Sequence, residues 1–456
     1  MDVSGQSIAI PESMYRSRPV ISGLEMVRIL IGLRTNQLDQ LNKLAALEEP
    51  VVTLKIPFKT FHFIFSSDLA QKILNEYATD FTKSANYKVI EPLLGKGLVT
   101  SDGELWAKQR KIINPFFTMK QYKLYTGSFK KHCQDLASDL KPHSGRDVDV
   151  SPFLINTTFK VLGTVLFGMD FGQYTAPLRS DLPGYLDYLM KRVFIKVPDW
   201  LPMPGHTKAK ISLDRINKIV DEVIRKEKAH PDPESRNSFI SVLIKAQRDH
   251  EHLTDKLIRD EVKTMMLAGH ETSSNTLGWA MWSLSERPDI QDKAFEEIQK
   301  FGDDPEFDQL KHMEYLRRII MESMRLHPPA YMFSRSPKEP IEINGLEIKP
   351  GDIVATPVWS IHRDPKIWDK PDKFDPDRFK KENFGIRQKK AYLPFGAGPR
   401  RCIGSEFGLL ETTAILCKLL GKFSFSRTGG FEPAYNPAIT LNSSNGIRLH
   451  LESRNN

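Results

Sequence analysis

The sequence is most distinctive between residues 393 and 404, which read Leu393-Pro394-Phe395-Gly396-Ala397-Gly398-Pro399-Arg400-Arg401-Cys402-Ile403-Gly404. Glycines on both sides of Cys402 let the backbone bend tightly and turn its N–H groups toward the sulfur. An apolar helical run follows from Phe407, and the N-terminus of a helix favours thiolate over thiol. Arg400 stands two residues before the sulfur, where it can meet an anionic group. These features meet the requirements of a thiolate axial ligand to iron.

Two other interpretations of this stretch fail for Cys402. A phosphate-binding glycine loop fails, because Pro399-Arg400-Arg401 follows Gly396-x-Gly398 and the third glycine of the dinucleotide fingerprint is missing. An incidental buried cysteine is the usual fate of a lone cysteine. That interpretation is preferred for Cys133 and Cys417, which lie in apolar helical surroundings. For Cys402 it is rejected, because too many constrained positions coincide.

Composition sets broad limits on the class of protein. The chain has 456 residues, 40% apolar and 27% charged, with a formal net charge of +8, which is typical of a globular protein and excludes disorder. Three widely spaced cysteines without a C-x-x-C pair indicate neither a disulfide framework nor a zinc site. The charge is too small and too dispersed to predict nucleic-acid binding.

The remaining pattern predicts a mainly α protein with small β-sheets (α+β). Val51 to Ser66 alternates and is rich in β-branched and aromatic residues, which predicts a hairpin in a strand-rich part at about 50–66. A helical core is expected over about 68–330, and short strands over 339–357 and 423–451. No linker interrupts the chain, so we expect a single large domain over 1–456 that contains the cysteine loop at 393–404.

The cysteine loop resembles the signature of the cytochrome P-450 family, F-x-x-G-x-R-x-C-x-G. Phe395, Gly398, Arg400, Cys402 and Gly404 match it without departure. The resemblance extends from about Val51 to Arg448. It implies a helical fold enclosing haem b, with the Cys402 thiolate as axial ligand and metal ligand, and a haem-thiolate monooxygenase similar to soluble bacterial members.

Two further segments fit this family. Glu322-x-x-Arg325 lies on one face of a predicted helix, where an isolated pair would mean little. The resemblance implies that Glu322, Arg325 and Arg378, from the segment Asp375 to Phe379, form a buried structural network. Breaking such a network would leave a charge stranded.

A long helix is predicted from Leu253 to Glu286, with Ala268-Gly269-His270-Glu271-Thr272 in its middle. Gly269 costs about 1 kcal/mol relative to Ala inside a helix, which suggests that another body approaches closely. A threonine hydroxyl can also bond back to a carbonyl one turn earlier. A polar patch on a solvated helix is the competing interpretation, which the flanking apolar residues weaken. The stretch resembles the family's A-G-x-[D/E]-T motif, which implies that Glu271 and Thr272 deliver protons during oxygen activation and that Ala268 borders the cofactor.

Several residues are assigned by the resemblance to the cofactor and its surroundings. Trp106 and Arg110 lie on one helix face and, with Arg335 and Arg400, are expected to bind the haem propionates. A core tryptophan beside a solvated arginine is the alternative for the first pair. The expected pocket is apolar and aromatic and is lined by Ile90, Leu94, Phe194, Met265, Tyr331, Phe333 and Ile439. A lipophilic substrate follows, such as a fatty acid, terpenoid or steroid.

Besides the substrate, the expected partner is a separate electron-donor protein. The acid–alcohol pair indicates a reductase-dependent enzyme, since peroxide-using relatives lack it. The chain after Cys402 is too short for a fused flavin domain, so a ferredoxin or flavodoxin with its reductase is expected, docking on Lys108, Lys111 and Arg401. No anchor or signal is visible near the N-terminus, and we expect a soluble cytoplasmic monomer. A non-catalytic haem-binding or sensor protein is the competing function, which the acid–alcohol pair disfavours.

Overall fold

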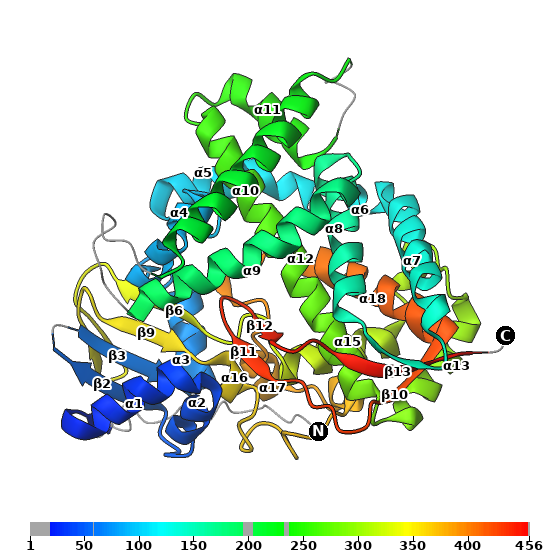
Figure 1. Cartoon of the computed structure of the whole chain (residues 1–456). Coiled ribbons are helices and arrows are strands. Elements are labelled where there is room, and N and C mark those ends of the chain that lie inside the picture. Colours follow the sequence, from blue (N-terminus) through cyan, green and yellow to red (C-terminus); the bar gives the residue numbers. More distant parts are fainter. Residues whose placement is uncertain (1–18, 58, 195–203, 232–236, 455–456) are drawn as a thin grey trace, which may run out of the picture.

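The computed structural model of the chain describes residues 19–57, 59–194, 204–231 and 237–454 (Figure 1). Most of the described chain is helical, and the largest sheet lies to one side, beside the first two helices. The helices are α1 (Gly23–Thr35), α2 (Gln37–Ala45), α3 (Ser67–Gln71), α4 (Glu91–Leu94), α5 (Gly103–Ile113), α6 (Met119–Leu124), α7 (Thr126–Leu140), α8 (Ser151–Phe167), α9 (Gly172–Phe194), α10 (His206–Lys228), α11 (Phe239–Asp249), α12 (Asp255–Leu284), α13 (Pro288–Phe301), α14 (Phe307–Leu310), α15 (Glu314–Leu326), α16 (Val358–Ile361), α17 (Ile386–Ala391) and α18 (Ser405–Lys422).

The strands form one 6-stranded sheet and three smaller sheets. The large sheet has the order β1-β2-β3-β9-β6-β4, the 3-stranded sheet the order β10-β13-β5, and the pairs β7-β8 and β11-β12 stand apart. The strands are β1 (Val20–Ile21), β2 (Val51–Ile56), β3 (Lys59–Ile64), β4 (Phe81–Lys83), β5 (Arg146–Asp149), β6 (Phe333–Pro337), β7 (Ile341–Ile343), β8 (Leu346–Ile348), β9 (Ile353–Thr356), β10 (Phe423–Arg427), β11 (Tyr435–Pro437), β12 (Leu441–Ser443) and β13 (Arg448–Ser453). The prediction of a mainly α protein with small sheets is confirmed.

The hairpin expected near residues 50–66 is present as β2 and β3. The strands are antiparallel, with Val51 opposite Ile64 and Ile56 opposite Lys59. β3 then pairs in parallel with β9, which brings the segment around residue 353 next to the N-terminal strands. β6 joins β9 to β4 in antiparallel pairs, so residues 81–83 and 333–337 lie side by side.

Two strands interrupt the part that the sequence predicts to be helical. β4 pairs with β6, and β5 pairs with β13 near the C-terminus. Each strand has only three or four residues, and its partner is far away along the chain. Short strands like these are stabilised by non-local pairing, which leaves no periodic pattern in the local sequence.

α12 runs through the middle of the helical part, packed against α8, α15 and α18 (Figure 1). It begins where Thr254 accepts a hydrogen bond from the Leu257 N–H at 3.2 Å. Its described side chains are mostly buried, including Met265, Met266 and Leu277. This burial contradicts the interpretation of a solvated helix, since a helix covered on all sides needs no polar stripe.

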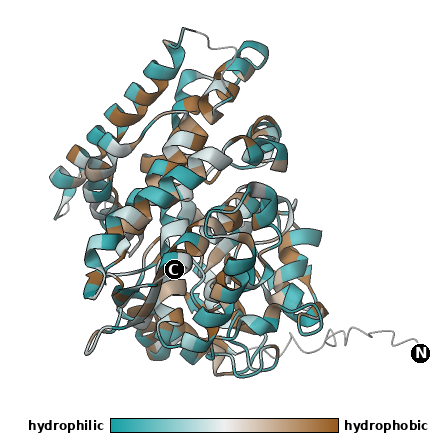
Figure 2. Ribbon diagram, turned by 90° about the vertical axis from the view of Figure 1, so that its right-hand side faces the viewer, coloured by the Kyte–Doolittle hydropathy of each residue, from teal (hydrophilic) through white to brown (hydrophobic). Residues whose placement is uncertain are grey.

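Hydrophilic and hydrophobic residues alternate along most of the helices (Figure 2). Among the described helices, no single one is long and apolar enough to cross a membrane. α8 and the first part of α9 pass that test only as a pair, and they are bent by 116° relative to each other. α8 is itself largely buried in the core, where an apolar helix is expected.

Candidate active site

The cysteine loop makes a tight turn before α18. The Cys402 N–H donates to the Phe395 carbonyl at 2.9 Å, and the Arg401 N–H donates to the Gly398 carbonyl at 3.0 Å. Gly398 has φ +67°, and a Cβ atom there would collide with the Leu74 carbonyl oxygen. The glycine therefore serves both the left-handed backbone and the close approach of the neighbouring turn.

The three cysteines differ in their surroundings. Cys133 and Cys417 are buried, whereas Cys402 is exposed. Burial raises the pKa of the Cys133 thiol to about 12, which makes it inert. Desolvation also raises the pKa of the Cys402 thiol, but the Gly404 N–H and the charges of Arg110 and Arg401 act in the opposite direction. Cys402 is thus the thiol that has both access and groups that favour the thiolate.

A cluster of positive charge lies beside the loop. Lys83 and Arg335 face each other across the β4–β6 pair. Arg400 stacks on the Trp106 ring at 4.0 Å and donates to the Ser101 carbonyl at 2.9 Å. Asp102 accepts a short hydrogen bond from Arg400 and another from the Lys83 N–H at 2.6 Å. We call these five residues, Lys83, Asp102, Trp106, Arg335 and Arg400, the cationic cradle.

The cradle carries more positive than negative charge. Burial, followed by the charges of Arg335 and Arg400, lowers the pKa of Lys83 well below its usual value. Burial lowers the pKa of Arg400 to about 10, although Asp102 opposes the change. Three cations share the single carboxylate of Asp102, so the cradle suits a ligand that brings two negative charges.

Arg110, expected to bind a propionate together with Trp106, contacts the residue after Arg400. Its Nη1 donates to the Arg401 carbonyl at 3.1 Å, and its charge acts on Cys402. Trp106 and Arg110 therefore share a helix face but contact different parts of the cysteine loop. Lys83 was not identified from the sequence, because nothing in its local pattern places it opposite Arg335.

The middle of α12 combines a close helix contact with the half-buried Thr272 and the buried His270. A Cβ atom on Gly269 would collide with Leu162 of α8, so the close approach inferred from this glycine is made by a neighbouring helix. The Thr272 hydroxyl donates to the Ala268 carbonyl at 2.8 Å, one turn earlier. His270 is buried, stacks on Phe159 at 3.7 Å and contacts the Met266 carbonyl at 2.7 Å, which leaves it no role as a ligand.

Glu271 is held on the C-terminal side of the fold. Asn442 Nδ2 donates to its Oε1 at 3.3 Å, and Thr440 also bonds to the carboxyl group. Burial raises the pKa of Glu271, and both hydrogen bonds oppose the shift. A carboxyl group that retains a proton above its ordinary range is suited to proton transfer near neutral pH.

A second buried carboxyl group, Glu411 of α18, lies next to this motif and was missed from the sequence. Ser273 donates to its Oε2 at 2.5 Å. Burial raises the pKa of Glu411 to about 8. Its position in an apolar helical run gave no signal of a polar partner from another helix.

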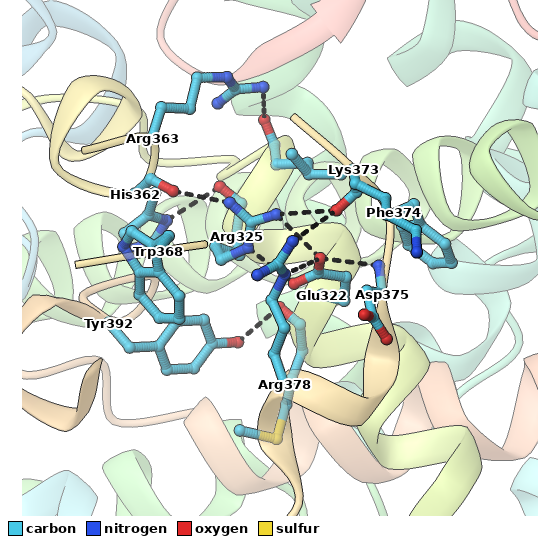
Figure 3. Close-up of polar contacts among 12 residues, drawn as sticks. Glu322, Arg325, His362, Arg363, Trp368, Lys373, Phe374, Asp375, Arg378 and Tyr392 are labelled. Atoms are coloured by element: carbon cyan, nitrogen blue, oxygen red, sulfur yellow. Dashed lines mark hydrogen bonds and ion pairs between the residues drawn. The ribbon is translucent and has the colours of Figure 1, made fainter. Parts of the chain in front are cut away.

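The structure brings Glu322, Arg325 and Arg378 together (Figure 3). Arg325 donates to both Glu322 oxygens, at 2.7 and 2.8 Å, and Arg378 Nε donates to Oε1 at 3.2 Å. The Asp375 N–H adds a further bond to Glu322 at 2.9 Å. Arg325 also donates to the carbonyls of His362 and Lys373, so this network ties α15 to the segment before the cysteine loop.

The residues expected to line a pocket separate into different surroundings. Ile90, Leu94 and Met265 are buried in the main core, with Ile439 packed against it. Tyr331 packs with the N-terminal helices, and its hydroxyl donates to Gln37 at 3.0 Å. Phe333 packs against the cluster around the large sheet. Phe194 ends α9, but its side chain and the expected pocket segment after it lie outside the described residues.

The residues present fit a haem group. Cys402 offers a single exposed thiol, and within the described part of the chain no three His, Cys, Asp or Glu side chains gather into another metal site. The charge of the cradle matches the two propionates of a haem. A lone thiolate in a glycine-rich loop, with such a cradle beside it, is typical of haem-thiolate proteins.

Comparisons with known proteins agree with this class. The Cytochrome P450 family model matches residues 19–449. Cyclooctatin synthase of Streptomyces melanosporofaciens is 28% identical over 86% of this chain and 86% of its own length. The probable cytochrome P450 4s3 of Drosophila melanogaster is 30% identical over 82% of this chain and 79% of its own. The crystal structure of the cytochrome P450DA heme domain superposes with a TM-score of 0.85 and 26% identity, covering 96% of this chain and 97% of that one.

The chain therefore belongs to the cytochrome P450 family. It is a haem-dependent monooxygenase, an oxidoreductase of the kind that the family and its named members define.

Proposed function

We propose that this chain binds haem b through the Cys402 thiolate and inserts one oxygen atom of O2 into a C–H bond of a lipophilic substrate. The observation that carries the proposal is the position of the exposed Cys402 thiol beside the cationic cradle, two residues from Arg400. One loop thus supplies both a ligand for iron and a partner for a propionate.

When bound, the haem supplies the redox chemistry, in which its iron activates O2 with electrons from a donor protein. The chain binds and orients the group. Cys402 would hold the iron through its thiolate, while Lys83, Trp106, Arg110, Arg335 and Arg400 would hold the propionates. Asp102 fixes Arg400 from the opposite side.

Glu271 and Thr272 move protons to the reacting side of the cofactor. Glu271 holds a proton above its ordinary pKa range because it is buried, and the hydrogen bonds from Thr440 and Asn442 fix its carboxyl group. The Thr272 hydroxyl is one residue away and already aligned by the Ala268 carbonyl at 2.8 Å. This arrangement supports a monooxygenase over a protein that only binds haem.

The substrate is a lipophilic molecule such as a fatty acid, terpenoid or steroid. Ile90, Leu94 and Met265 are buried in the main apolar core, with Ile439 packed against it. An apolar wall excludes water and offers few groups that could bind a charged substrate. A spectral-shift screen with lipid, terpenoid and steroid libraries tests this class, and a response confined to polar compounds would contradict it.

A separate ferredoxin or flavodoxin supplies the electrons. Lys108, Lys111 and Arg401 are exposed on the side of Cys402, where an acidic partner can dock. Changing Lys108 and Lys111 to Glu is expected to raise the KM for the donor. The matched control changes the exposed Lys218 and Lys349 to Glu, and equal effects of the two variants would remove the docking assignment.

The spectrum of the reduced protein with carbon monoxide tests the ligand directly. Cys402→Ser is expected to abolish the red-shifted Soret band of a thiolate-bound haem. Cys133→Ser and Cys417→Ser serve as controls and are expected to retain it, since both thiols are buried away from the loop. An unchanged band in Cys402→Ser would overturn the proposal.

A further inference from the structure

Residues 95–101 form a loop that joins two functional parts of the molecule. On one side the loop follows α4, which ends at Leu94 in the expected pocket wall. On the other side it reaches Ser101, whose carbonyl accepts from Arg400, and Asp102 of the cationic cradle. The position of this loop therefore affects both the pocket and the cofactor cradle.

Two consecutive carboxyl groups of α12 hold the loop. Asp260 Oδ2 accepts from the Lys96 N–H at 3.0 Å, and Glu261 Oε2 accepts from the Leu98 N–H at 3.0 Å. Asp260 is 3% exposed and Glu261 is fully buried. Gln109 of α5 supports the same loop by donating to the Lys96 carbonyl at 2.7 Å.

The loop touches α12 without side chains in between. A Cβ atom on Gly95, which has φ +58°, would collide with the Asp260 carboxylate. A Cβ atom on Gly97 would collide with Thr264. Both glycines are therefore required for the loop to approach the turn of α12 that carries Asp260 and Glu261.

The two carboxyl groups differ in their charge partners. Lys263 Nζ lies 3.2 Å from Asp260 Oδ1, which neutralises that carboxylate. Glu261 Oε1 is buried and has no hydrogen-bond partner among the described residues. Ionisation of Glu261 would place an unpaired charge in the interior next to the Asp260 carboxylate, which is costly unless water reaches it.

Among the charged groups around this turn, Asp260 is the one whose charge shifts the pKa of Glu261. Burial, with a smaller contribution from the Asp260 charge, raises the pKa of Glu261 to about 8, and the Leu98 N–H opposes the shift. The loop itself brings the exposed Lys96 side chain, and α4 brings the half-buried Glu91. Several charged groups of α10 and of the start of α12 form ion pairs, as Asp221 with Arg259, Glu222 with Lys226 and Lys228 with Asp255. The neighbouring α11 begins at Ser238, whose hydroxyl donates to Glu227 of α10. The charged residues of α11, Lys245, Arg248 and Asp249, lie toward its C-terminal end.

We propose that Asp260 and Glu261 act as positioning residues that latch loop 95–101 onto α12, and that the latch loosens when Glu261 loses its proton. Glu261, Ala268 and Thr272 are spaced by seven and four residues and so lie on one face of α12. The loosened loop therefore moves over the helix face that carries the proposed catalytic pair. Substrate affinity then falls at alkaline pH, and this part of the inference rests on the proposed function.

Hydrogen exchange in the holoenzyme tests the latch without any substrate. With a pKa of about 8, Glu261 is roughly one tenth ionised at pH 7 and nine tenths ionised at pH 9. Amides in the peptide covering residues 95–101 are expected to exchange several-fold faster over that range, beyond the ordinary base-catalysed increase. Glu261→Gln keeps the acceptor for Leu98 but cannot ionise, so its exchange is expected to follow the base-catalysed increase alone.

Two further variants complete the test. Asp260→Asn removes the negative charge next to Glu261 and frees Lys263. The pH midpoint of the step in hydrogen exchange is therefore expected to move to lower pH. Glu296→Gln on the surface of α13 is the matched control and should behave as the wild type. An alkaline step that persists in Glu261→Gln, or its absence from the wild type, would overturn the latch. The substrate dissociation constant, followed by spectral shift over the same pH range, should rise in the wild type and stay level in Glu261→Gln. If exchange shows the step but no compound produces a spectral shift at any pH, the latch stands and the proposed substrate class fails.

Discussion

Replacing Glu322 by Gln removes the carboxylate that Arg325 and Arg378 share in the buried network (Figure 3). Arg325 and Glu322 are both fully buried, and four hydrogen bonds end on the carboxylate. Gln keeps the shape but leaves the Arg325 guanidinium without a counterion in the interior. Removing one partner of such a pair costs about 3–5 kcal/mol, whereas exposed pairs contribute little.

The loss is measured by urea denaturation of the holoenzyme, followed by circular dichroism and by haem absorbance. A decrease of about 4 kcal/mol corresponds to a melting temperature lower by roughly 4 °C for a chain of this length that unfolds in one step. Asp39→Asn, which breaks the exposed i,i+4 pair with Lys43, is the control and should unfold close to the wild type. If Glu322→Gln lost less than about 1 kcal/mol, the carboxylate would not be the centre of the network, and the argument from buried charge would be refuted.

Three other changes test the site. Thr272→Ala should keep the spectrum but divert electrons to peroxide, and product formed per electron at the wild-type level would contradict proton delivery. Lys83→Met removes one cation of the cradle and should speed haem transfer to apomyoglobin several-fold, whereas Lys83→Arg should restore retention. For Glu411, whose folded-state pKa of about 8 lies above its ordinary value, the folded state binds more protons between about pH 4.5 and 8. Stability should therefore fall as pH rises through that window, and this slope should flatten in Glu411→Gln; an identical slope in both proteins would show that Glu411 does not titrate there.

Local patterns in the sequence were sufficient for the elements that follow a simple period. The β2–β3 hairpin and the long α12 lie close to their predicted bounds, and Glu322 and Arg325 lie on a helix as predicted. Each depends on contacts between neighbours along the chain, such as cross-strand pairs or a helix cap.

The parts that the sequence did not reveal depend on contacts between distant residues. Lys83 enters the cradle because β4 pairs with β6, and the polar contact of Glu411 depends on Ser273 from another helix. Arg110 shares a helix face with Trp106 as expected, and its hydrogen bond to the Arg401 carbonyl joins residues far apart in the sequence. Helical spacing predicts which residues share a face, but the partner across that face is decided by tertiary packing.

The pairing of β4 with β6 has a consequence for laboratory evolution of this enzyme. Lys83 and Arg335 stand opposite each other, and the Ser84 and Ser334 hydroxyls beside them are 2.6 Å apart. The chain immediately after Lys83 and immediately before Arg335 leads to residues expected to contact substrate. Libraries that randomise these two segments to broaden substrate range will therefore also shift the strand pair that we propose retains the cofactor. Variants selected for a new substrate should be screened for haem occupancy first, because lost cofactor and altered selectivity will otherwise be confused.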